Sequence, residues 1–207
     1  IQFSTERLIR LVNDLLNVSR IEQGRLKFDL SEFDATTVVK ETVESLMPVA
    51  KEKNIELRFK GTGNIKVFSD QDKVKQLVVN LVGNSLKFTD KGFIEVSVTQ
   101  NKQEVLVSVR DSGIGISKED QKRVFGRFEQ ISSVQKGRPQ GTGLGLYISQ
   151  ILAKKMGGDL WLERSEEGKG SEFVFSLLLS DNKKVNAIKN QIAKEEKEHP
   201  DQKAMAV

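Results

Sequence analysis

Three glycines at alternate positions, in the stretch GRPQGTGLGLYIS at residues 137–149, are the first candidates for chemistry. Gly141, Gly143 and Gly145 stand directly before the apolar pattern of a helix. Glycine backbone can approach a ligand closely and adopt positive φ, and a helix start offers unpaired N–H groups and partial positive charge. The pattern therefore predicts a phosphate site, with a loop and a plain helix cap as the alternative. The spacing G-x-G-x-G fits neither the dinucleotide fingerprint nor the P-loop.

A polar stripe on a second stretch, residues 70–89, carries groups that bind metal and phosphate. Asn80, Asn84 and Lys87 follow one another at intervals of three and four within an otherwise apolar helical pattern, and Phe88 comes next. Buried carboxamides are costly unless they are satisfied. Their oxygens can coordinate Mg²⁺ and their NH₂ groups can donate to phosphate, while the lysine adds a positive charge. The alternative is a solvated helix face.

Asp111 ends an alternating strand pattern and is followed by Gly113 and Gly115 in the stretch VRDSGIGIS. An ionised carboxylate only accepts hydrogen bonds. In a deep pocket it selects a donor such as the exocyclic amine of adenine, and the glycines would let a base lie flat against the backbone. The alternative is a turn with Asx chemistry at a strand end.

Phe125 and Phe128 stand three apart in RVFGRFEQ. They read either as a satellite core cluster or as an anchor for the polar segment 131–140, which contains Lys136 and Arg138. A basic segment beside a phosphate site can close over a nucleotide and exclude water.

Periodicity indicates the elements that would position these residues. Helical patterns cover three stretches: 4–22, 33–54 and 70–89. Strand patterns cover five: 55–60, 93–100, 104–111, 160–165 and 171–179. Asp34 is placed to cap the second helix, and Pro48 inside it predicts a kink. Because neighbouring strands join by hairpins while helices are interleaved with them, we expect an α+β domain with a mixed sheet covered by helices on one face.

The chain divides into three parts. Residues 1–26 read as one long amphipathic helix, residues 27–180 as the interleaved domain, and residues 181–207 as a charged tail, weakly helical or disordered. The first helix has an apolar stripe along one side that must pack against another helix or chain. We expect this stripe to support a homodimer. The stripe repeats at three and four: Leu8, Leu11, Leu15 and Val18.

Composition excludes several classes of function. The net charge is +4 with both signs interspersed, so we expect no nucleic acid partner. The chain has no cysteine and one histidine, which excludes thiolate and multi-histidine metal sites. No apolar run reaches the length of a membrane span and no signal peptide opens the chain. We therefore expect a cytoplasmic location and no membrane contact from this chain, which reads as a piece of a longer protein.

Four stretches, in this order, resemble the conserved boxes of the catalytic and ATP-binding domain of bacterial sensor histidine kinases. NLVGNSLKF is similar to their N box, DSGIGI to the first glycine box, FGRFEQ to the F box and GTGLGL to the second glycine box. RLIRLVNDLLNVSRIEQGRL resembles the second helix of their dimerisation and histidine-phosphotransfer domain. The resemblance covers residues 5–180 and implies a two-layer α/β sandwich of the Bergerat type, preceded by one long bundle helix, that binds ATP with Mg²⁺.

By position, the resemblance implies a role for each matched residue. Asn80 would be the favoured metal ligand, Asn84 would touch phosphate or metal, and Lys87 would contact phosphates. Phe88 would lie by the base or ribose, and Asp111 would hold the adenine amine. The other implied nucleotide-binding residues are Gly113, Gly115, Ile116, Lys136, Arg138, Gly141, Thr142, Gly143, Leu144, Gly145 and Leu146. The residues implied to act in the transfer itself are Asn84, Lys87 and Gln130.

Two departures from the family pattern matter. The family's phosphoacceptor lies in an earlier helix, in a motif like H-E-L-R-T-P, which this chain lacks, and His199 in KEHPD has the wrong context to replace it. The implied reaction thus transfers the γ-phosphate of ATP to a histidine on a helix of the parent kinase outside this chain, for relay to an aspartate of a response-regulator receiver domain. Ser85 stands where the family often has alanine, and we expect it to be harmless.

Other classes fit less well. Serine kinases of the same ATPase superfamily share the asparagine and glycine boxes, but the Phe-x-x-Phe turn and the N-terminal helix argue against them. DNA-dependent or chaperone ATPases carry extra transducer domains, for which this chain is too short. A non-catalytic module that binds a partner through residues 4–22 is the remaining alternative.

Overall fold

The computed structural model describes residues 2–23, 25–129 and 142–186 of the chain. Its helices are α1 (Gln2–Glu22), α2 (Ala35–Glu52), α3 (Gln71–Phe88), α4 (Lys118–Gln121) and α5 (Gly145–Lys155). Its strands are β1 (Leu30–Asp34), β2 (Ile55–Gly61), β3 (Lys66–Asp70), β4 (Gly92–Gln100), β5 (Glu104–Asp111), β6 (Leu160–Glu166) and β7 (Gly170–Leu178). Within the described ranges, no helix is both long and apolar enough to cross a membrane.

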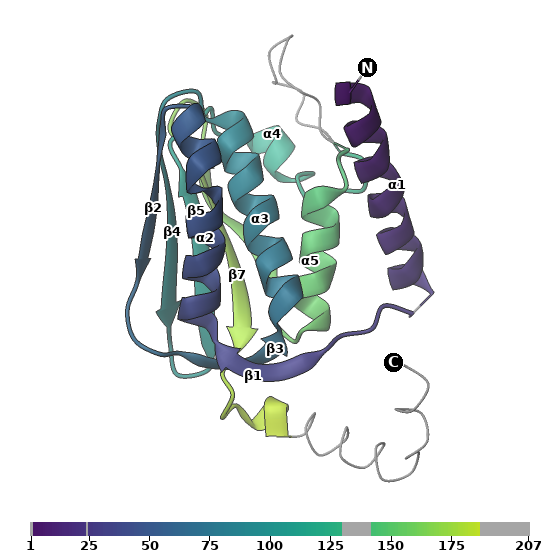
Figure 1. Cartoon of the computed structure of the whole chain (residues 1–207), viewed down its shortest axis with the longest axis vertical. Helices are drawn as coiled ribbons and strands as arrows, with labels where there is room; N and C mark the ends of the chain where they lie inside the picture. The colour runs from purple at the N-terminus through teal and green to yellow at the C-terminus, as the bar shows by residue number, and fades with distance from the viewer. Residues whose placement is uncertain (1, 24, 130–141, 187–207) are drawn as a thin grey trace.

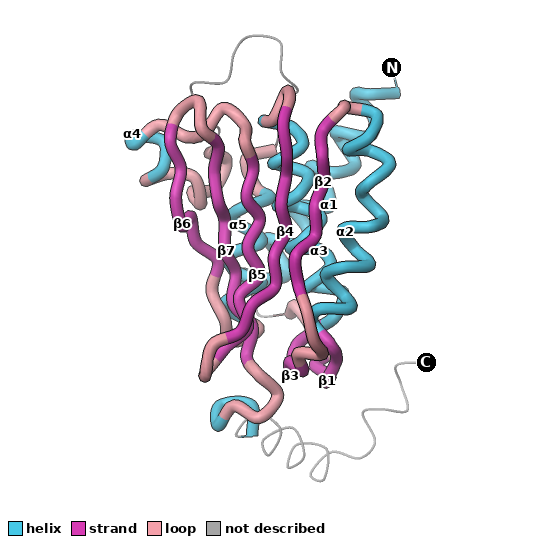
Figure 2. Tube along the Cα trace, turned by 90° about the vertical axis from the view of Figure 1, so that its left-hand side faces the viewer, coloured by secondary structure: helices cyan, strands magenta, loops and turns pink. Residues whose placement is uncertain are grey.

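Five strands form one mixed sheet in the order β2-β4-β5-β7-β6. β2 and β4 are parallel, and the other neighbours are antiparallel. Helices α2, α3 and α5 lie on one face of this sheet, behind the strands in Figure 2, and stand side by side in Figure 1. The predicted α+β fold, its two hairpins and its one-sided helix layer are therefore confirmed.

The core lies between the sheet and these helices. Alternate residues of β4 and β5 point into it and are buried, as period-two patterning requires: Ile94, Val96, Val98, Val105, Val107 and Val109. Leu77 and Leu81 of α3 are fully buried against them. The apolar face of α3 is thus fixed to the sheet, which leaves its polar stripe at the edge of the core.

A two-stranded antiparallel ribbon of β1 and β3 lies at the lower end of Figure 1 and was not predicted. Each strand has five residues, and neither shows a clean alternation of buried and exposed positions. The ribbon nevertheless sets the starts of two helices. Asp34, as predicted, caps α2 by accepting from the Thr36 N–H, and Asp70 caps α3 through the N–H groups of Asp72 and Lys73.

Helix α2 runs through Pro48 and ends only at Glu52. Proline removes one backbone donor and crowds the carbonyl four residues earlier, which is why a kink was predicted. The helix continues on both sides of Pro48, and the kink stays a prediction.

Helix α1 packs on α5 through Val18, which is 1% exposed, whereas Leu8 and Leu15 are 61% and 44% exposed. Val18 therefore packs inside this chain and is not available to a second copy in this arrangement. Self-association through Leu8, Leu11 and Leu15 stays a prediction.

The start of the tail is folded. Residues 183–186 form a helical turn, and Val185 is fully buried in a small cluster with Phe68 and Leu178. The weakly helical alternative for the tail agrees with these residues, and the tail as a whole stays a prediction. Residues 187–207, which include His199, lie outside the described part, and the divisions at 26/27 and 180/181 stay predictions.

Candidate nucleotide-binding site

The polar stripe of α3 faces the start of α5. The Asn80 carboxamide nitrogen donates to the Ser149 hydroxyl over 2.8 Å and so joins the two helices. A Cβ atom placed on Gly145 would lie 2.6 Å from the Asn80 carboxamide oxygen. The missing side chain at Gly145 therefore makes room for the Asn80 oxygen beside the first residue of α5.

No described side chain caps the α5 N-terminus, where Leu144 takes the N-cap position. The Thr142 hydroxyl instead accepts from the Leu144 N–H at 3.2 Å and donates to the Asp14 carboxylate of α1 at 2.8 Å. Gly143 has φ +72°, and a Cβ there would lie 2.7 Å from the Phe128 carbonyl carbon. Glycine is required at this turn, and the free N–H groups of the first helical turn suit an anion.

Asp111 lies at the end of β5 and is 6% exposed. Its Oδ1 accepts from the Gly113 N–H at 2.9 Å and the Ser171 N–H at 3.2 Å, and its Oδ2 accepts from the Ser85 hydroxyl at 3.1 Å. Burial raises the pKa of Asp111, while these three donors oppose that rise because they favour the ionised form. The site holds an oriented carboxylate that can accept from an amine.

The packing of the loop after Asp111 also requires glycine at positions 113 and 115. A Cβ on Gly113 would lie 2.5 Å from the Phe88 carbonyl oxygen. Gly115 has φ +69°, and a Cβ there would lie 2.0 Å from the Glu166 carbonyl oxygen. Both glycines therefore let the loop pack against the ends of α3 and β6, whether or not a base lies nearby.

The remaining predicted residues fall into two groups. Asn84, Lys87 and Phe88 are half-buried on the last turns of α3, and the Lys87 ammonium lies 4.7 Å from the centre of the Phe88 ring. Ile116 and Leu144 are buried in the core, so their backbone, not their side chains, is what a nucleotide could meet. Leu146 is partly buried against the same core. Gln130, Lys136, Arg138 and Gly141 lie outside the described residues.

The two phenylalanines of the F box, Phe125 and Phe128, have different surroundings. Phe125 packs edge-on against Phe173 of β7 with ring centres 6.1 Å apart, which agrees with the core interpretation. Phe128 is 50% exposed and has φ +61°, a conformation that a bulky residue rarely adopts. Phe128 therefore lies exposed beside the turn at Gly143.

Four side-chain or backbone contacts of the site were not predicted from the sequence. Ser171 comes from β7, Ser149 from α5 and Asp14 from α1, so only the fold brings them to Asp111, Asn80 and Thr142. Ser85 was visible as a departure from the family pattern, but its bond to Asp111 was not. Spacing along one helix reports neighbours on that helix only.

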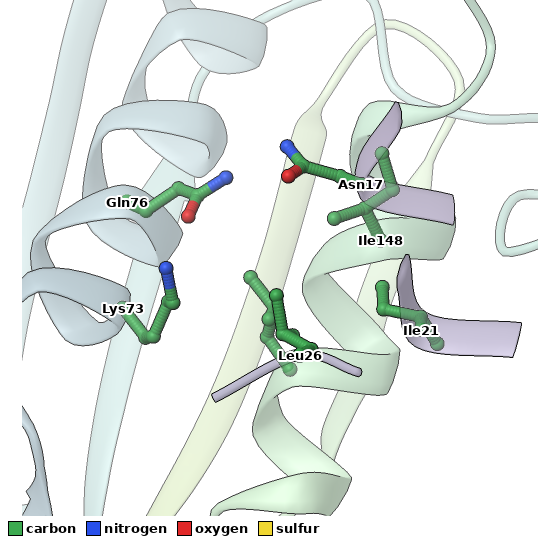
Figure 3. Close-up of a pocket in the computed structure, with 7 residues that line it drawn as sticks. Asn17, Ile21, Leu26, Lys73, Gln76 and Ile148 are labelled. Atoms are coloured by element: carbon green, nitrogen blue, oxygen red, sulfur yellow. The ribbon is translucent and has the colours of Figure 1, made fainter. Parts of the chain in front are cut away.

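A separate small cavity, partly open to solvent, lies where α1, α3 and α5 meet (Figure 3). Gln76 and Lys73 project into it from α3, and Asn17 projects from α1. Its apolar wall is formed by Ile21, Leu26, Ile148 and Leu152. It borders the first half of α3, whereas Asp111 contacts the last, so it is distinct from the nucleotide site.

A mixed sheet covered by helices on one face, with Asn80 of α3 beside Gly145 at the start of α5, is typical of one class of ATP-binding domain. A family model described as histidine kinase-, DNA gyrase B- and HSP90-like ATPase matches residues 69–181, more than half of the chain. The chain belongs to this family.

Its relatives agree with that assignment. The signal transduction histidine-protein kinase BarA of Escherichia coli K12 is 36% identical over 196 residues, covering 89% of this chain and 21% of the relative. The sensor histidine kinase WalK of Bacillus subtilis is 36% identical over 180 residues, covering 85% and 29%. The chain thus spans less than a third of the length of these curated relatives.

Solved structures confirm the predicted two-layer sandwich of the Bergerat type. Full-length ShkA in complex with AMPPNP matches with a TM-score of 0.74 and 29% identity over 85% of this chain and 37% of that one. The catalytic domain of the histidine kinase ThkA matches with a TM-score of 0.64 and 27% identity over 73% of this chain and 99% of that one.

Proposed function

We propose that this chain is the ATP-binding catalytic part of a sensor histidine kinase. It would transfer the γ-phosphate of ATP to a histidine on a helix of the parent kinase that lies outside this chain. The observation that carries the proposal is that α3 contacts both a buried, oriented carboxylate, Asp111, through Ser85 and the start of α5 through the Asn80–Gly145 contact. The named activities of the relatives support it.

The proposed nucleotide extends from Asp111 to the start of α5. The Asp111 carboxylate accepts from the adenine amine, and Phe88 lies by the base or ribose. The N–H groups of residues 142–146 face the phosphates, where the helix dipole favours negative charge. A neighbour crystallised with AMPPNP supports ATP as the ligand.

The site also fits Mg²⁺. Because the Asn80 nitrogen donates to Ser149, its carboxamide oxygen is left as an acceptor beside α5, and Asn84 lies one turn further along α3. Mg²⁺ typically takes one or two protein oxygens together with substrate phosphates, and when bound it neutralises phosphate charge. Among the described residues there is no group of three or more His, Cys, Asp and Glu side chains that could hold a metal instead.

Phosphoryl transfer needs positioning and charge neutralisation more than covalent help from the protein. Lys87 and the α5 N–H groups supply positive charge, and Gln130 orients the γ-phosphate. Lys136 and Arg138 close over the nucleotide. An imidazole nitrogen of the incoming histidine attacks the γ-phosphorus in line, the bond to the β–γ bridging oxygen breaks, and ADP leaves. A carboxylate oxygen of a response-regulator aspartate then attacks the same phosphorus and frees the imidazole. We place this part of the protein in the cytoplasm.

The variant Asp111→Asn tests the nucleotide site. Asparagine is nearly the same size, so the fold is expected to survive, but its NH₂ group replaces an acceptor with a donor. We expect the affinity for ADP, measured by titration calorimetry, to fall by about tenfold to a hundredfold, the usual size for a charged hydrogen bond. Asp181→Asn, on the exposed surface, is the control. Unchanged affinity in Asp111→Asn would refute the site.

A further inference from the structure

Ser85 and Thr89 form a buried polar cluster with Asp111 at the end of α3. Their exposed fractions are 3%, 3% and 6%. The Ser85 carbonyl accepts from the Thr89 N–H at 3.0 Å, which closes the last turn of the helix. Both hydroxyls are thereby fixed to the end of α3 nearest the carboxylate.

The Ser85 hydroxyl is the side-chain donor to Asp111. Two backbone N–H groups donate to Oδ1, whereas Oδ2 accepts from Ser85. An ionised carboxylate has about four lone-pair sites, so Oδ2 keeps an acceptor site for a ligand. Ser85 therefore sets the direction in which that acceptor points.

The Thr89 hydroxyl is buried and has no hydrogen-bond partner among the described residues. A Cβ atom placed on Gly113 would lie 2.9 Å from Thr89 Oγ1 and 3.0 Å from Asp111 Oδ1. The Thr89 hydroxyl and the Asp111 carboxylate therefore lie on either side of the same small space. A buried hydroxyl left without a partner destabilises the protein. Its position beside the carboxylate indicates a partner that arrives with the ligand.

We propose that Ser85 and Thr89 are specificity-determining hydroxyls of the base site. Ser85 positions the Asp111 carboxylate for the exocyclic amine, and Thr89 bonds, directly or through one water, to the ring nitrogen beside that amine. Adenine offers a donor amine next to an acceptor nitrogen, whereas guanine offers the reverse order and would face Asp111 with an acceptor. The inference rests on the proposed nucleotide function.

The Ser85→Ala variant tests the positioning role through a pH profile. ADP binding needs the ionised carboxylate, so affinity falls as pH drops through the pKa of Asp111. Removing a donor to the ionised form raises that pKa further, so the fall begins at higher pH in the variant. We expect an ADP affinity about tenfold below wild type at the acid end of the profile and a smaller deficit at the alkaline end.

Ser69→Ala is the matched control, because Ser69 is also buried but lies in β3, where its hydroxyl donates to the Met156 sulfur after α5. It should keep the wild-type profile. A Ser85→Ala profile that superimposes on wild type, in a variant with native circular dichroism, would overturn the positioning role.

Thr89 is tested with ADP and with 1-deaza-ADP, in which carbon replaces the ring nitrogen. Wild type should bind the analogue about tenfold more weakly, as expected for one lost hydrogen bond. Thr89→Val should bind both nucleotides equally, and Thr89→Ser should restore the difference. Full discrimination in Thr89→Val would overturn the contact.

Different results would refute the proposed nucleotide function and the roles of the Ser85 and Thr89 hydroxyls. If wild type binds no ADP, the proposed function is wrong and this inference with it. If ADP binds and Asp111→Asn weakens it, while the Ser85 and Thr89 variants behave as wild type, only the hydroxyl roles are wrong.

Discussion

At the residue scale, Gly145 and Asn80 depend on each other although they come from different helices. The bond of Asn80 to α5 spans 69 positions of sequence. Each residue was singled out from its own motif, Asn80 for its place on a polar stripe and Gly145 for its place in a glycine run. That their atoms meet could not be predicted, because it depends on how α3 and α5 pack.

We predict that Gly145→Ala weakens nucleotide binding without unfolding the protein. Alanine favours helix more than glycine does by about 1 kcal/mol, but its Cβ would lie 2.6 Å from the Asn80 oxygen. Titration calorimetry should show a loss of several-fold or more in ADP affinity in the presence of Mg²⁺.

Gly83→Ala is the matched control for this change. Gly83 lies inside α3, and a Cβ there meets nothing within 4 Å. It should raise the free energy of unfolding by about 0.5–1 kcal/mol and leave ADP affinity unchanged. Equal affinities for Gly145→Ala and wild type would contradict the steric account of Gly145.

At the element scale, the long amphipathic patterns were predictable and the short strands were not. α3, β4 and β5 each bury one face on the core, so their periodicity survives in the sequence. β1 and β3 show no alternation, because β1 buries only Phe33 and β3 is buried on both faces from Val67 to Asp70. What the sequence shows of them is Asp34 at the start of the next helix. The elements that carry Asn80, Asn84 and Asp111, which are α3 and β5, were therefore predicted. The two-stranded ribbon of β1 and β3, which leads into α2 and α3, was not.

We predict that Asp34→Ala destabilises the protein by about 1–2 kcal/mol, the usual cost of a lost N-cap. Asp34 accepts from the N–H groups of Thr36 and Ile65 and from the Thr37 hydroxyl. Urea unfolding at neutral pH measures the change, with the exposed residue Asp181 changed to Ala as the control.

The same contact predicts a pH dependence. Partial burial opposes the effect, but the hydrogen bonds from Thr37, Ile65 and Thr36 lower the pKa of Asp34 below the ordinary value of an aspartate. Its contribution is therefore present above that value and is lost as pH falls through the lowered pKa. The stability difference between wild type and Asp34→Ala should shrink in acid. A constant difference at all pH values would be inconsistent with this role.

At the scale of the whole molecule, the described side chains of α1 hold it mainly to α5 and to the turn before it. Val18 is its buried apolar residue on α5, and Asp14 holds Thr142 at the turn before α5. The cavity at Asn17 and Gln76 separates α1 from α3 (Figure 3). Helix α1 is therefore placed to move relative to the domain while the sheet and α3 stay packed.

We predict that Val18→Asp releases α1 and leaves the domain folded, because burying an unpaired carboxylate is costly. Hydrogen exchange should become faster across α1, whereas β4 and β5 keep their protection. Leu16→Asp is the control, since Leu16 is 50% exposed. Loss of protection in β4 and β5 of the Val18 variant would show that α1 is an integral part of the fold.

The central proposal is that this chain carries the ATP-binding and catalytic residues of a histidine kinase and transfers phosphate to a histidine on another segment of the parent kinase. The most direct test mixes this chain with γ-labelled ATP, Mg²⁺ and a separately made histidine-bearing helical hairpin from its parent kinase. We predict acid-labile, base-stable label on the hairpin, absent with Asp111→Asn. A wild-type chain that binds ADP but never labels the hairpin would contradict the claim and favour a nucleotide-binding module without kinase activity.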